Sequence, residues 1–169
     1  MTELTTKLRP LEPEDLDELY AIENDRDIWN VGATNVPYSR YALHEYIDRQ
    51  QADIYADRQL RLVVENAEKQ VVGLVDLVNF EPQHRRAELG IVIKQAFRGQ
   101  GYGQSAIKKM LDYAKKTLHL HQVYVIIDAE NHESLQLFRQ VGFEEKSRLK
   151  DWLFDGENYC EAVLMQKFL

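Results

Sequence analysis

A short glycine-rich segment, Arg98-Gly99-Gln100-Gly101-Tyr102-Gly103, has the residue types and the spacing of an anion-binding site. Glycine lets the backbone turn sharply and approach an anion without a Cβ in the way. The segment stands where an expected strand gives way to an expected helix, and the first N–H groups of a helix have no partner within that helix. The pattern therefore predicts a cradle for a phosphate or pyrophosphate group.

Two common nucleotide-binding motifs do not fit this cradle. A Walker loop ends in Gly-Lys-Ser/Thr, whereas Gly103 is followed by Gln104 and Ser105. A dinucleotide-binding fingerprint has the spacing Gly-x-Gly-x-x-Gly near the start of a βαβ unit, whereas the spacing here is Gly-x-Gly-x-Gly after three expected antiparallel strands. The remaining alternative is a glycine-rich turn that binds nothing, and three alternating glycines beside Arg98 argue against it.

The apolar periodicity predicts the elements that position this cradle. Expected strands cover residues 4–8, 60–65, 71–80, 88–93, 123–128, 143–149 and 159–166. Expected helices begin at Pro13, Ser39, Gly101 and Asn131, and the second extends to about residue 55. Short connections between the strands of residues 60–93 favour an antiparallel meander. The prediction is one α+β domain over residues 1–169, with a mostly antiparallel sheet and helices on both of its faces.

The net charge of −7 is distributed unevenly along the chain. Residues 1–60 contain 13 acidic and 6 basic side chains, whereas the rest of the sequence is balanced. An acidic field of this kind disfavours binding to nucleic acid and favours cationic partners. The alternative is a solvated acidic face that aids solubility.

Other features of the composition narrow the class of protein. The single cysteine, Cys160, excludes an internal disulfide, which suits a reducing compartment. The N-terminal residues lack the basic region and the apolar run of a signal peptide, and no stretch has the roughly 20 apolar residues of a membrane span. The five histidines show no metal-binding spacing. We therefore expect a cytoplasmic enzyme or binding domain with no membrane segment and no metal.

Two motifs in this order resemble the GCN5-related N-acetyltransferase (GNAT) family. The family signature Gln/Arg-x-x-Gly-x-Gly/Ala is matched by Arg98, Gly101 and Gly103. A second family element, Asn-x-x-Ser-x-x-x-Tyr-x-x-x-Gly-Phe, is matched by Asn131, Ser134, Gly142 and Phe143. Segments 8–16, 72–77 and 84–88 are similar to the branch of bacterial spermidine acetyltransferases, with the ribosomal-protein alanine acetyltransferases as a related branch. The resemblance implies a GNAT-like fold and an acetyl-CoA-dependent transfer of an acetyl group to a primary amine.

The resemblance also implies where acetyl-CoA binds as cosubstrate. In the family, the strand before the phosphate loop pairs through its backbone with the pantetheine arm, and the start of the later helix binds the far side of the cofactor. The residues at these places are Ile91, Val92, Ile93, Arg98, Gly99, Gln100, Gly101, Tyr102, Gly103, Asn131, Ser134 and Phe138. For Asn131 a plain helix N-cap is the alternative, and both roles are compatible. Gly90, within the strand, is consistent with a bulge or a close backbone approach.

Glu88 is the expected catalytic base. A protonated alkylamine has a pKa of about 10.4, so it must lose a proton before it can attack a thioester. A carboxylate can accept that proton directly or through a water molecule, and glutamate occurs at this strand position in many members of the family. The alternative is a surface carboxylate paired with Arg85 or Arg86.

Phe138 departs from the family pattern, which often has a tyrosine there to protonate the leaving thiolate. Phenylalanine cannot donate a proton. Water or another group, with Tyr124 and Tyr159 as candidates, must then supply it, or the thiolate leaves unassisted, which a thiol pKa of about 8.5 permits. Cys160 as a covalent nucleophile is disfavoured, because a cysteine in a core strand is commonly a small hydrophobe.

The acceptor site is expected between the two N-terminal helices. Trp29 and Tyr38 are the expected substrate-binding residues, with Glu23, Asp25 and Asp27 nearby, because aromatic faces and carboxylates suit a cationic amine. The favoured acceptor is a small-molecule polyamine such as spermidine. The alternatives are a protein N-terminal amine, or a catalytically weak coenzyme A-binding module. The sequence leaves the oligomeric state open, including a homo-oligomer.

Overall fold

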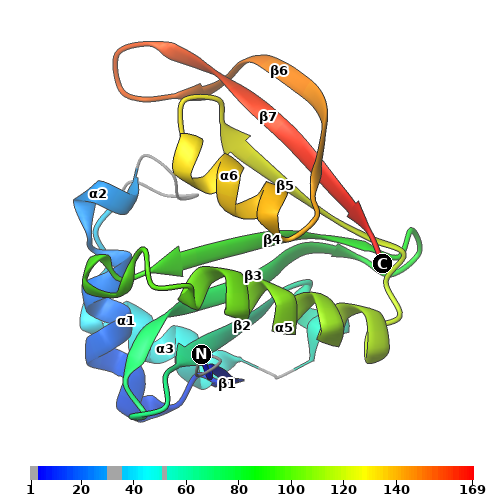
Figure 1. Ribbon diagram of the computed structural model, residues 1–169. Helices are drawn as coiled ribbons and strands as arrows, with labels where there is room; N and C mark the ends of the chain where they lie inside the picture. The colour runs from blue at the N-terminus through cyan, green and yellow to red at the C-terminus, as the bar shows by residue number, and fades with distance from the viewer. Residues whose placement is uncertain (1–3, 30–35, 51–52) are drawn as a thin grey trace.

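Seven strands form one sheet in the order β1-β2-β3-β4-β5-β7-β6 in the computed structural model, which describes residues 4–29, 36–50 and 53–169 (Figure 1). All neighbouring strands are antiparallel except β4 and β5, which are parallel. The predicted α+β class and the predicted meander of residues 60–93 are confirmed. The strands are β1 Lys7–Pro10, β2 Leu60–Glu65, β3 Val71–Glu81, β4 Arg86–Ile93, β5 Gln122–Asp128, β6 Glu144–Phe154 and β7 Tyr159–Phe168.

The four predicted helices begin close to the expected residues, and two further short helices, Arg26–Trp29 and Gln95–Phe97, were not predicted. Ser39 caps the third helix, since its Oγ accepts a hydrogen bond of 3.0 Å from the N–H of Ala42. The single helix expected over residues 39–55 is two helices, because the Asp53 side chain accepts from the N–H of Tyr55 and caps a new start. The helices are η1 Pro13–Asp15, α1 Leu16–Glu23, α2 Arg26–Trp29, α3 Arg40–Arg49, α4 Ile54–Asp57, η2 Gln95–Phe97, α5 Tyr102–Lys116 and α6 His132–Gln140. In the described part of the chain, no helix has the length and apolar character needed to cross a membrane.

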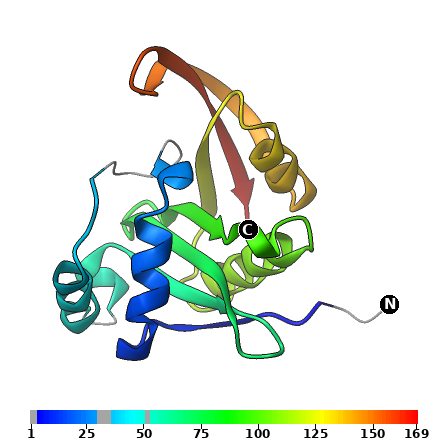
Figure 2. The same ribbon diagram turned by 90° about the vertical axis from the view of Figure 1, so that its left-hand side faces the viewer.

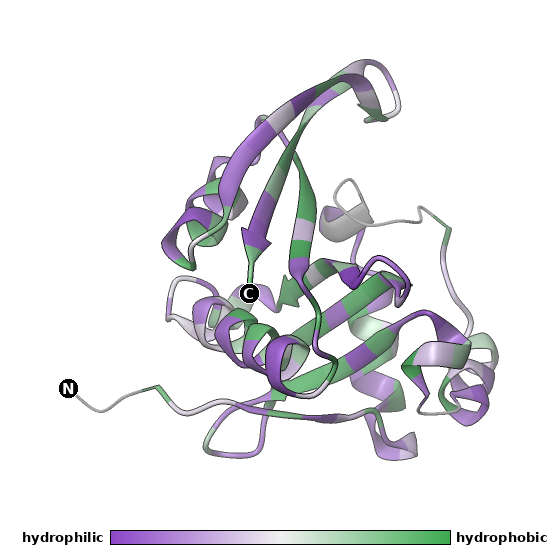
Figure 3. Cartoon of the chain, turned by 90° about the vertical axis from the view of Figure 1, so that its right-hand side faces the viewer, coloured by the Kyte–Doolittle hydropathy of each residue, from purple (hydrophilic) through white to green (hydrophobic). Residues whose placement is uncertain are grey.

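Helices cover both faces of the sheet, as predicted (Figures 1 and 2). On one face, α5 buries Ile107, Met110 and Ala114 completely against the central strands. On the other face, α1 and α3 contribute Leu19 and Leu43 to a second core cluster. Figure 3 shows that hydrophobic residues run through the strands of the sheet. The two cores fix the strands between them, which makes β4 a rigid support for a site.

β4 and β5 pair only at their beginnings, and this arrangement creates a fork in the sheet. Their parallel register covers Arg86↔Gln122, Ala87↔Val123 and Glu88↔Tyr124. Beyond Glu88, β4 continues along β3, whereas β5 continues along β7. Figure 1 shows β5, β7 and α6 leaving the plane of β4 together. We call the last paired position, Glu88 and Tyr124, the base of the fork.

The bulge allowed for at Gly90 is not there. The β3–β4 register runs without a break past Gly90 and shifts only between Val78 and Glu81 on β3. A Cβ at Gly90 would meet only the Asp76 side chain, at 3.6 Å, which is an ordinary contact. The close backbone approach lies at Gly73, where a Cβ would come within 2.1 Å of the Val92 carbonyl oxygen.

The closing hairpin of β6 and β7 is longer than predicted. Its turn contains Asp155 and Gly156: the N–H of Asp155 donates to the carbonyl of Asn158 at 3.1 Å, and Gly156 has a φ of 106°. β6 extends to Phe154, with a register shift between Leu149 and Leu153. This shift interrupts the alternation of side chains between the two faces of β6. The strand predicted from that alternation therefore ended at residue 149.

Candidate functional site

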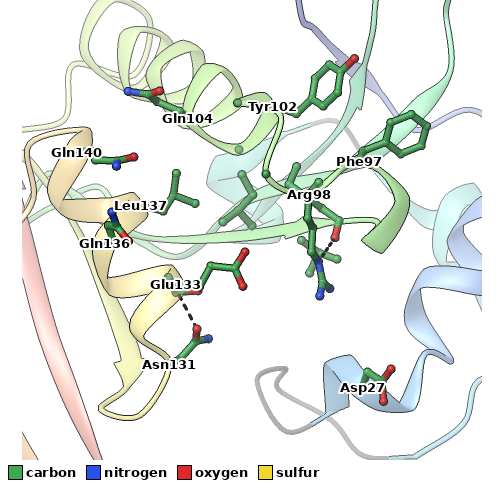
Figure 4. A pocket seen from close by; sticks show the side chains of 17 residues that line it. Asp27, Phe97, Arg98, Tyr102, Gln104, Asn131, Glu133, Gln136, Leu137 and Gln140 are labelled. Atoms are coloured by element: carbon green, nitrogen blue, oxygen red, sulfur yellow. Dashed lines mark hydrogen bonds between the residues drawn. The ribbon is translucent and has the colours of Figure 1, made fainter.

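A cavity of about 510 Å³ lies beside the fork (Figure 4). Its wall comes from the end of β4, the cradle of residues 98–103, one face of α6, and Asp27 of α2. Ten of the expected cofactor-binding residues line it: Ile91, Val92, Ile93, Arg98, Gly99, Gly101, Tyr102, Gly103, Asn131 and Ser134. Residues from distant parts of the sequence therefore meet at one cavity.

The cradle has the backbone geometry of an anion site. Gly99 and Gly101 have φ values of 72° and 91°, in the left-handed region that favours glycine. Gly101 caps α5, and the first backbone bond there runs from the N–H of Ser105 to the Gly101 carbonyl at 3.1 Å. The three preceding N–H groups, of Tyr102, Gly103 and Gln104, consequently have no partner within the helix. All three residues line the cavity, so it contains the positive end of the α5 dipole.

Gly103 has a separate, steric reason to be glycine. A Cβ at this position would lie 3.2 Å from Cδ2 of Leu137 on α6 and 3.6 Å from Cγ1 of Ile93. The absence of a side chain lets α6 and the end of β4 approach the start of α5. The same residue thus keeps the cavity narrow at the cradle.

Arg98 adds a fixed positive charge next to the cradle. Its Nε donates a hydrogen bond of 2.9 Å to the Ile93 carbonyl, drawn as a dashed line in Figure 4. This bond anchors an otherwise exposed side chain to the end of β4. The guanidinium can then offer its remaining N–H groups to a phosphate.

The backbone of β4 presents polar groups that have no partner strand to the gap of the fork, and of these the Ile93 carbonyl accepts the bond from Arg98. The N–H of Lys94 donates to the Val72 carbonyl at 2.9 Å, on the β3 side. Because hydrogen-bonded and non-bonded pairs alternate in an antiparallel ladder, Val92 also bonds toward β3, whereas Ile91 and Ile93 direct their N–H and C=O groups away from it. β5 does not pair with this part of β4. An extended ligand with amide groups can therefore bond to β4 as a neighbouring strand would.

Asn131 and Ser134 line the cavity and also cap α6. The Asn131 Oδ1 accepts a hydrogen bond of 3.1 Å from the N–H of Ser134, so the N-cap alternative holds. The rest of this wall was not predicted from the sequence, although its residues have the spacing i, i+3, i+4, i+7 of one helix face. These lining residues are Glu133, Gln136, Leu137 and Gln140, and Figure 4 shows Glu133 pointing into the cavity. Phe97 and Gln104 were also missed.

Two expected cofactor-binding residues do not lie on the cavity wall. The Gln100 amide donates to the Ala96 carbonyl at 3.0 Å and turns back over the preceding loop. Phe138 is only 2% exposed, and its ring packs edge-on against Phe143 at a centroid distance of 5.1 Å. Phe138 therefore belongs to the core beneath α6, because the apolar face of the helix turns it inward.

Glu88 lies at the base of the fork, opposite Tyr124. Its Oε2 accepts a hydrogen bond of 2.8 Å from Nδ2 of Asn79 on β3. Of the two arginines considered as partners, Arg85 donates instead to the His119 carbonyl at 2.8 Å. Within the described residues, neither Arg85 nor Arg86 forms an ion pair with Glu88.

The expected acceptor region is described in part. Tyr38 is half-buried. The Asn24 side chain forms two hydrogen bonds with the Tyr38 backbone, because its amide donates to the carbonyl at 3.0 Å and its Oδ1 accepts from the N–H at 2.8 Å. Trp29 ends α2, and its side chain lies outside the described part of the chain. Glu23 forms an ion pair with Arg61, which also binds Asp76. Asp27 is therefore the carboxylate of this group that reaches the cavity.

Cys160 does not have the surroundings of a nucleophile. Partial burial and the nearby Asp155 carboxylate raise the pKa of its thiol, which keeps it from forming a thiolate. In the part of the chain that the structure describes, no group of three or more His, Cys, Asp or Glu side chains is arranged to hold a metal ion.

Comparison with known proteins agrees with this geometry. The family model of the acetyltransferase (GNAT) domain matches residues 6–144. The chain is 32% identical to the spermidine N(1)-acetyltransferase of Escherichia coli (strain K12) over 161 residues, which cover 95% of this chain and 84% of that protein. It is 31% identical to the spermidine N(1)-acetyltransferase of Vibrio cholerae over 167 residues, covering 96% and 94%.

Solved structures extend the likeness to three dimensions. The crystal structure of spermidine N-acetyltransferase from Vibrio cholerae in complex with CoA and spermine has a TM-score of 0.87 at 31% identity. The match covers 96% of this chain and 95% of that one. Motifs, fold and cavity therefore agree, and the chain belongs to the GNAT family of acetyltransferases as an N-acetyltransferase.

Proposed function

We propose that this enzyme transfers the acetyl group of acetyl-CoA to a primary amine of a polyamine such as spermidine. The observation that carries the proposal is the course of the cavity, which follows the free edge of β4 from the cradle to Ile91, with Glu88 farther along the same strand. Relatives at 31–32% identity over nearly the whole chain are spermidine N-acetyltransferases, and one of them has been solved with CoA and spermine. These relatives support the acceptor class.

In this proposal the cradle and Arg98 bind the pyrophosphate of the cosubstrate. The free N–H groups at the start of α5 and the anchored guanidinium suit that charge. The backbone groups of Ile91 and Ile93 bond to the amides of the pantetheine arm, and the α6 wall, including Asn131 and Ser134, closes the other side. From Ile93 to Glu88 the strand covers about 17 Å at 3.4 Å per residue. An arm laid along it carries the thioester toward the base of the fork.

Glu88 acts as the base. The acceptor arrives as an ammonium ion, and the carboxylate accepts a proton from it directly or through a water molecule. The hydrogen bond from Asn79 holds one carboxylate oxygen, which leaves the other for the amine. The proposed step uses side chains of this chain and no metal.

The carboxylate and aromatic groups of the N-terminal helices recognise the rest of the acceptor. Asp27, which lines the cavity, binds a second ammonium group of the polyamine. Trp29 and Tyr38, at the two sides of the segment between α2 and α3, provide aromatic surface for its methylene chain and its charge.

A panel of amines tests this proposal through the release of free coenzyme A thiol. The panel contains spermidine, spermine, a monoamine with an uncharged tail, and short peptides with a free N-terminus. We expect turnover with the polyamines. Reaction with the peptides alone would assign the enzyme to protein N-termini instead. Binding of acetyl-CoA without turnover of any amine would leave a coenzyme A-binding module.

A further inference from the structure

Three polar side chains meet at the base of the fork: Asn79, Glu88 and Tyr124. Glu88 and Tyr124 are Cα partners in the parallel register, so their side chains leave the sheet on the same face. Their sequence neighbours Ala87 and Val123 are fully buried in the core under α5. Glu88 and Tyr124 therefore face the opposite side, where α1 and α3 lie and where the acceptor is expected.

A bulge in β3 directs Asn79 to this pair. The register shifts between Val78 and Glu81, and Asn79 has a φ of 49° in the left-handed region, which asparagine tolerates better than most residues. The extra residue of the bulge places the Asn79 amide beside both partners. It donates to Glu88 at 2.8 Å and also hydrogen-bonds Tyr124. One side chain thus fixes the carboxylate and the phenol together.

Phe138 occupies the position that often carries a proton-donating tyrosine in the family, and it cannot protonate the thiolate. Phe138 has no hydroxyl and is buried against Phe143. Of the two tyrosines that the sequence leaves as candidates, Tyr159 lies on the outer hairpin, is 69% exposed, and packs on Phe154. Tyr124, by contrast, is half-buried at the point where β4 and β5 separate.

We propose that Tyr124 donates the proton to the departing coenzyme A thiolate, and that Asn79 positions Tyr124 and Glu88 for their two proton transfers. The inference rests on the proposed acetyl transfer. It adds a donor for the thiolate and a positioning residue that acts through the hydrogen bonds of its amide.

The proposed step balances in atoms and charge. Glu88 removes one proton from the ammonium group, and the free amine nitrogen attacks the thioester carbonyl carbon. The C–N bond forms, the C–S bond breaks, and the Tyr124 hydroxyl proton moves to the sulfur. The second proton of the nitrogen returns to the Tyr124 oxygen, and Glu88 releases its proton to solvent. An ammonium ion and a thioester become an amide, a thiol and one released proton.

The groups around Tyr124 keep its hydroxyl protonated. Burial and the charge of Glu88 raise the pKa of Tyr124, with a smaller contribution from Glu81, whereas Arg86 and the bond to Asn79 act in the opposite direction. Its register partner on β7 is the uncharged Gln166. The phenol is therefore present as a donor throughout the neutral range, because the unperturbed value is already about 10.

Tyr124→Phe tests the donor, with Tyr159→Phe as the matched control. We expect Tyr124→Phe to lower kcat by about 10²–10⁴-fold, the usual contribution of a general acid, while the KM for acetyl-CoA stays unchanged. Tyr159→Phe should keep the wild-type kcat. The discriminating measurement uses the selenoester analogue of acetyl-CoA, whose selenol is a stronger acid and leaves without a proton. The loss caused by Tyr124→Phe should shrink markedly with the selenoester.

Asn79→Gly tests the positioning role, since glycine accepts the left-handed backbone and removes only the amide. We expect a lower kcat, a smaller loss than in Tyr124→Phe, and again a weaker effect with the selenoester. A Tyr124→Phe enzyme with wild-type kcat, or with equal losses for both esters, overturns the inference while the acetyl transfer stands. If the wild-type enzyme turns over no amine, the proposed function fails first and the inference fails with it.

Discussion

At the residue scale, the proposed chemistry depends on the side chains that surround Glu88 at the base of the fork. Glu88 accepts a hydrogen bond from Asn79, and Arg85, one of the two arginines near it in sequence, donates instead to the His119 carbonyl. A carboxylate in this state can accept a proton from an incoming ammonium group. Phe138, which the family pattern places next to the cosubstrate, is instead a core residue in this chain.

Glu88→Gln tests the base. The amide keeps the shape of the side chain but cannot accept the proton, so we expect kcat to fall by about 10²–10⁴-fold at neutral pH. Affinity for acetyl-CoA, measured by titration, should stay nearly unchanged. The loss should shrink as the pH rises toward the amine pKa, because more acceptor then arrives already deprotonated. A fully active Glu88→Gln enzyme would remove the base assignment.

Phe138→Ala separates a core role from a cofactor-binding role. Removing a buried phenylalanine typically costs about 3–5 kcal/mol of unfolding free energy. We expect a loss of that size in chemical denaturation, with the acetyl-CoA affinity of the folded protein changed little. A variant that keeps its stability and loses acetyl-CoA affinity would instead place the ring against the cosubstrate.

At the element scale, the site is made by strands and helices that end at the same place. The end of β4, the N-terminus of α5 and one face of α6 surround the cavity, and the fork keeps β5 away from the upper part of β4. The positive end of the α5 dipole therefore faces the same space as the free backbone groups of β4.

Gly101→Asp tests the cradle. The substitution places a side chain and a negative charge at a position with a φ of 91° on the cavity wall, so we expect the thermal stabilisation by acetyl-CoA to disappear. Gly156→Asp is the matched control. Gly156 has a φ of 106° and open space around it in the β6–β7 turn, so that variant carries a similar backbone strain without touching the cavity. Equal ligand-induced shifts in both variants would argue against the cradle.

The sequence predicts these elements well where local patterns decide them. The meander, the α5 core face and the caps at Ser39 and Asn131 follow from periodicity and side-chain chemistry. The sequence does not predict features that depend on contacts between distant segments of the chain. The register shift that turns Asn79 toward Glu88 has no local signal, because it is set by the pairing of β3 with β4. The polar face of α6 was readable from its spacing, but only the fold shows that this face borders the cavity.

At the scale of the whole molecule, five acidic side chains of the first third form ion pairs within the fold. The ion pairs are Asp15 with Arg9, Asp17 with Arg40, Glu18 with Lys94, Glu23 with Arg61, and Glu45 with Arg49. Three of these pairs use arginines of the same segment, so among the five only Arg61 and Lys94 offset its excess of negative charge. Of the described carboxylates of the first third, Asp27 lies on the cavity wall, which Glu133 of α6 also lines.

The salt dependence of acceptor binding tests this local charge. We expect the KM for spermidine to rise with ionic strength, since exposed charges are screened over about 8–10 Å near physiological salt. A monoamine with an uncharged tail should show a weaker dependence. Asp27→Asn should raise the spermidine KM and reduce its salt dependence, with the KM for acetyl-CoA unchanged. A spermidine KM that does not respond to salt would contradict the role of the carboxylate.

The most direct test of the central claim is the product of the reaction. The protein is incubated with acetyl-CoA carrying an isotope-labelled acetyl group and with spermidine, and the polyamine is analysed by mass spectrometry. We expect spermidine that carries one labelled acetyl group on a primary amine, formed together with an equal amount of free thiol, and we expect its yield to fall strongly with Glu88→Gln. Thiol release without labelled polyamine, or unmodified spermidine in the presence of bound acetyl-CoA, would contradict the central claim.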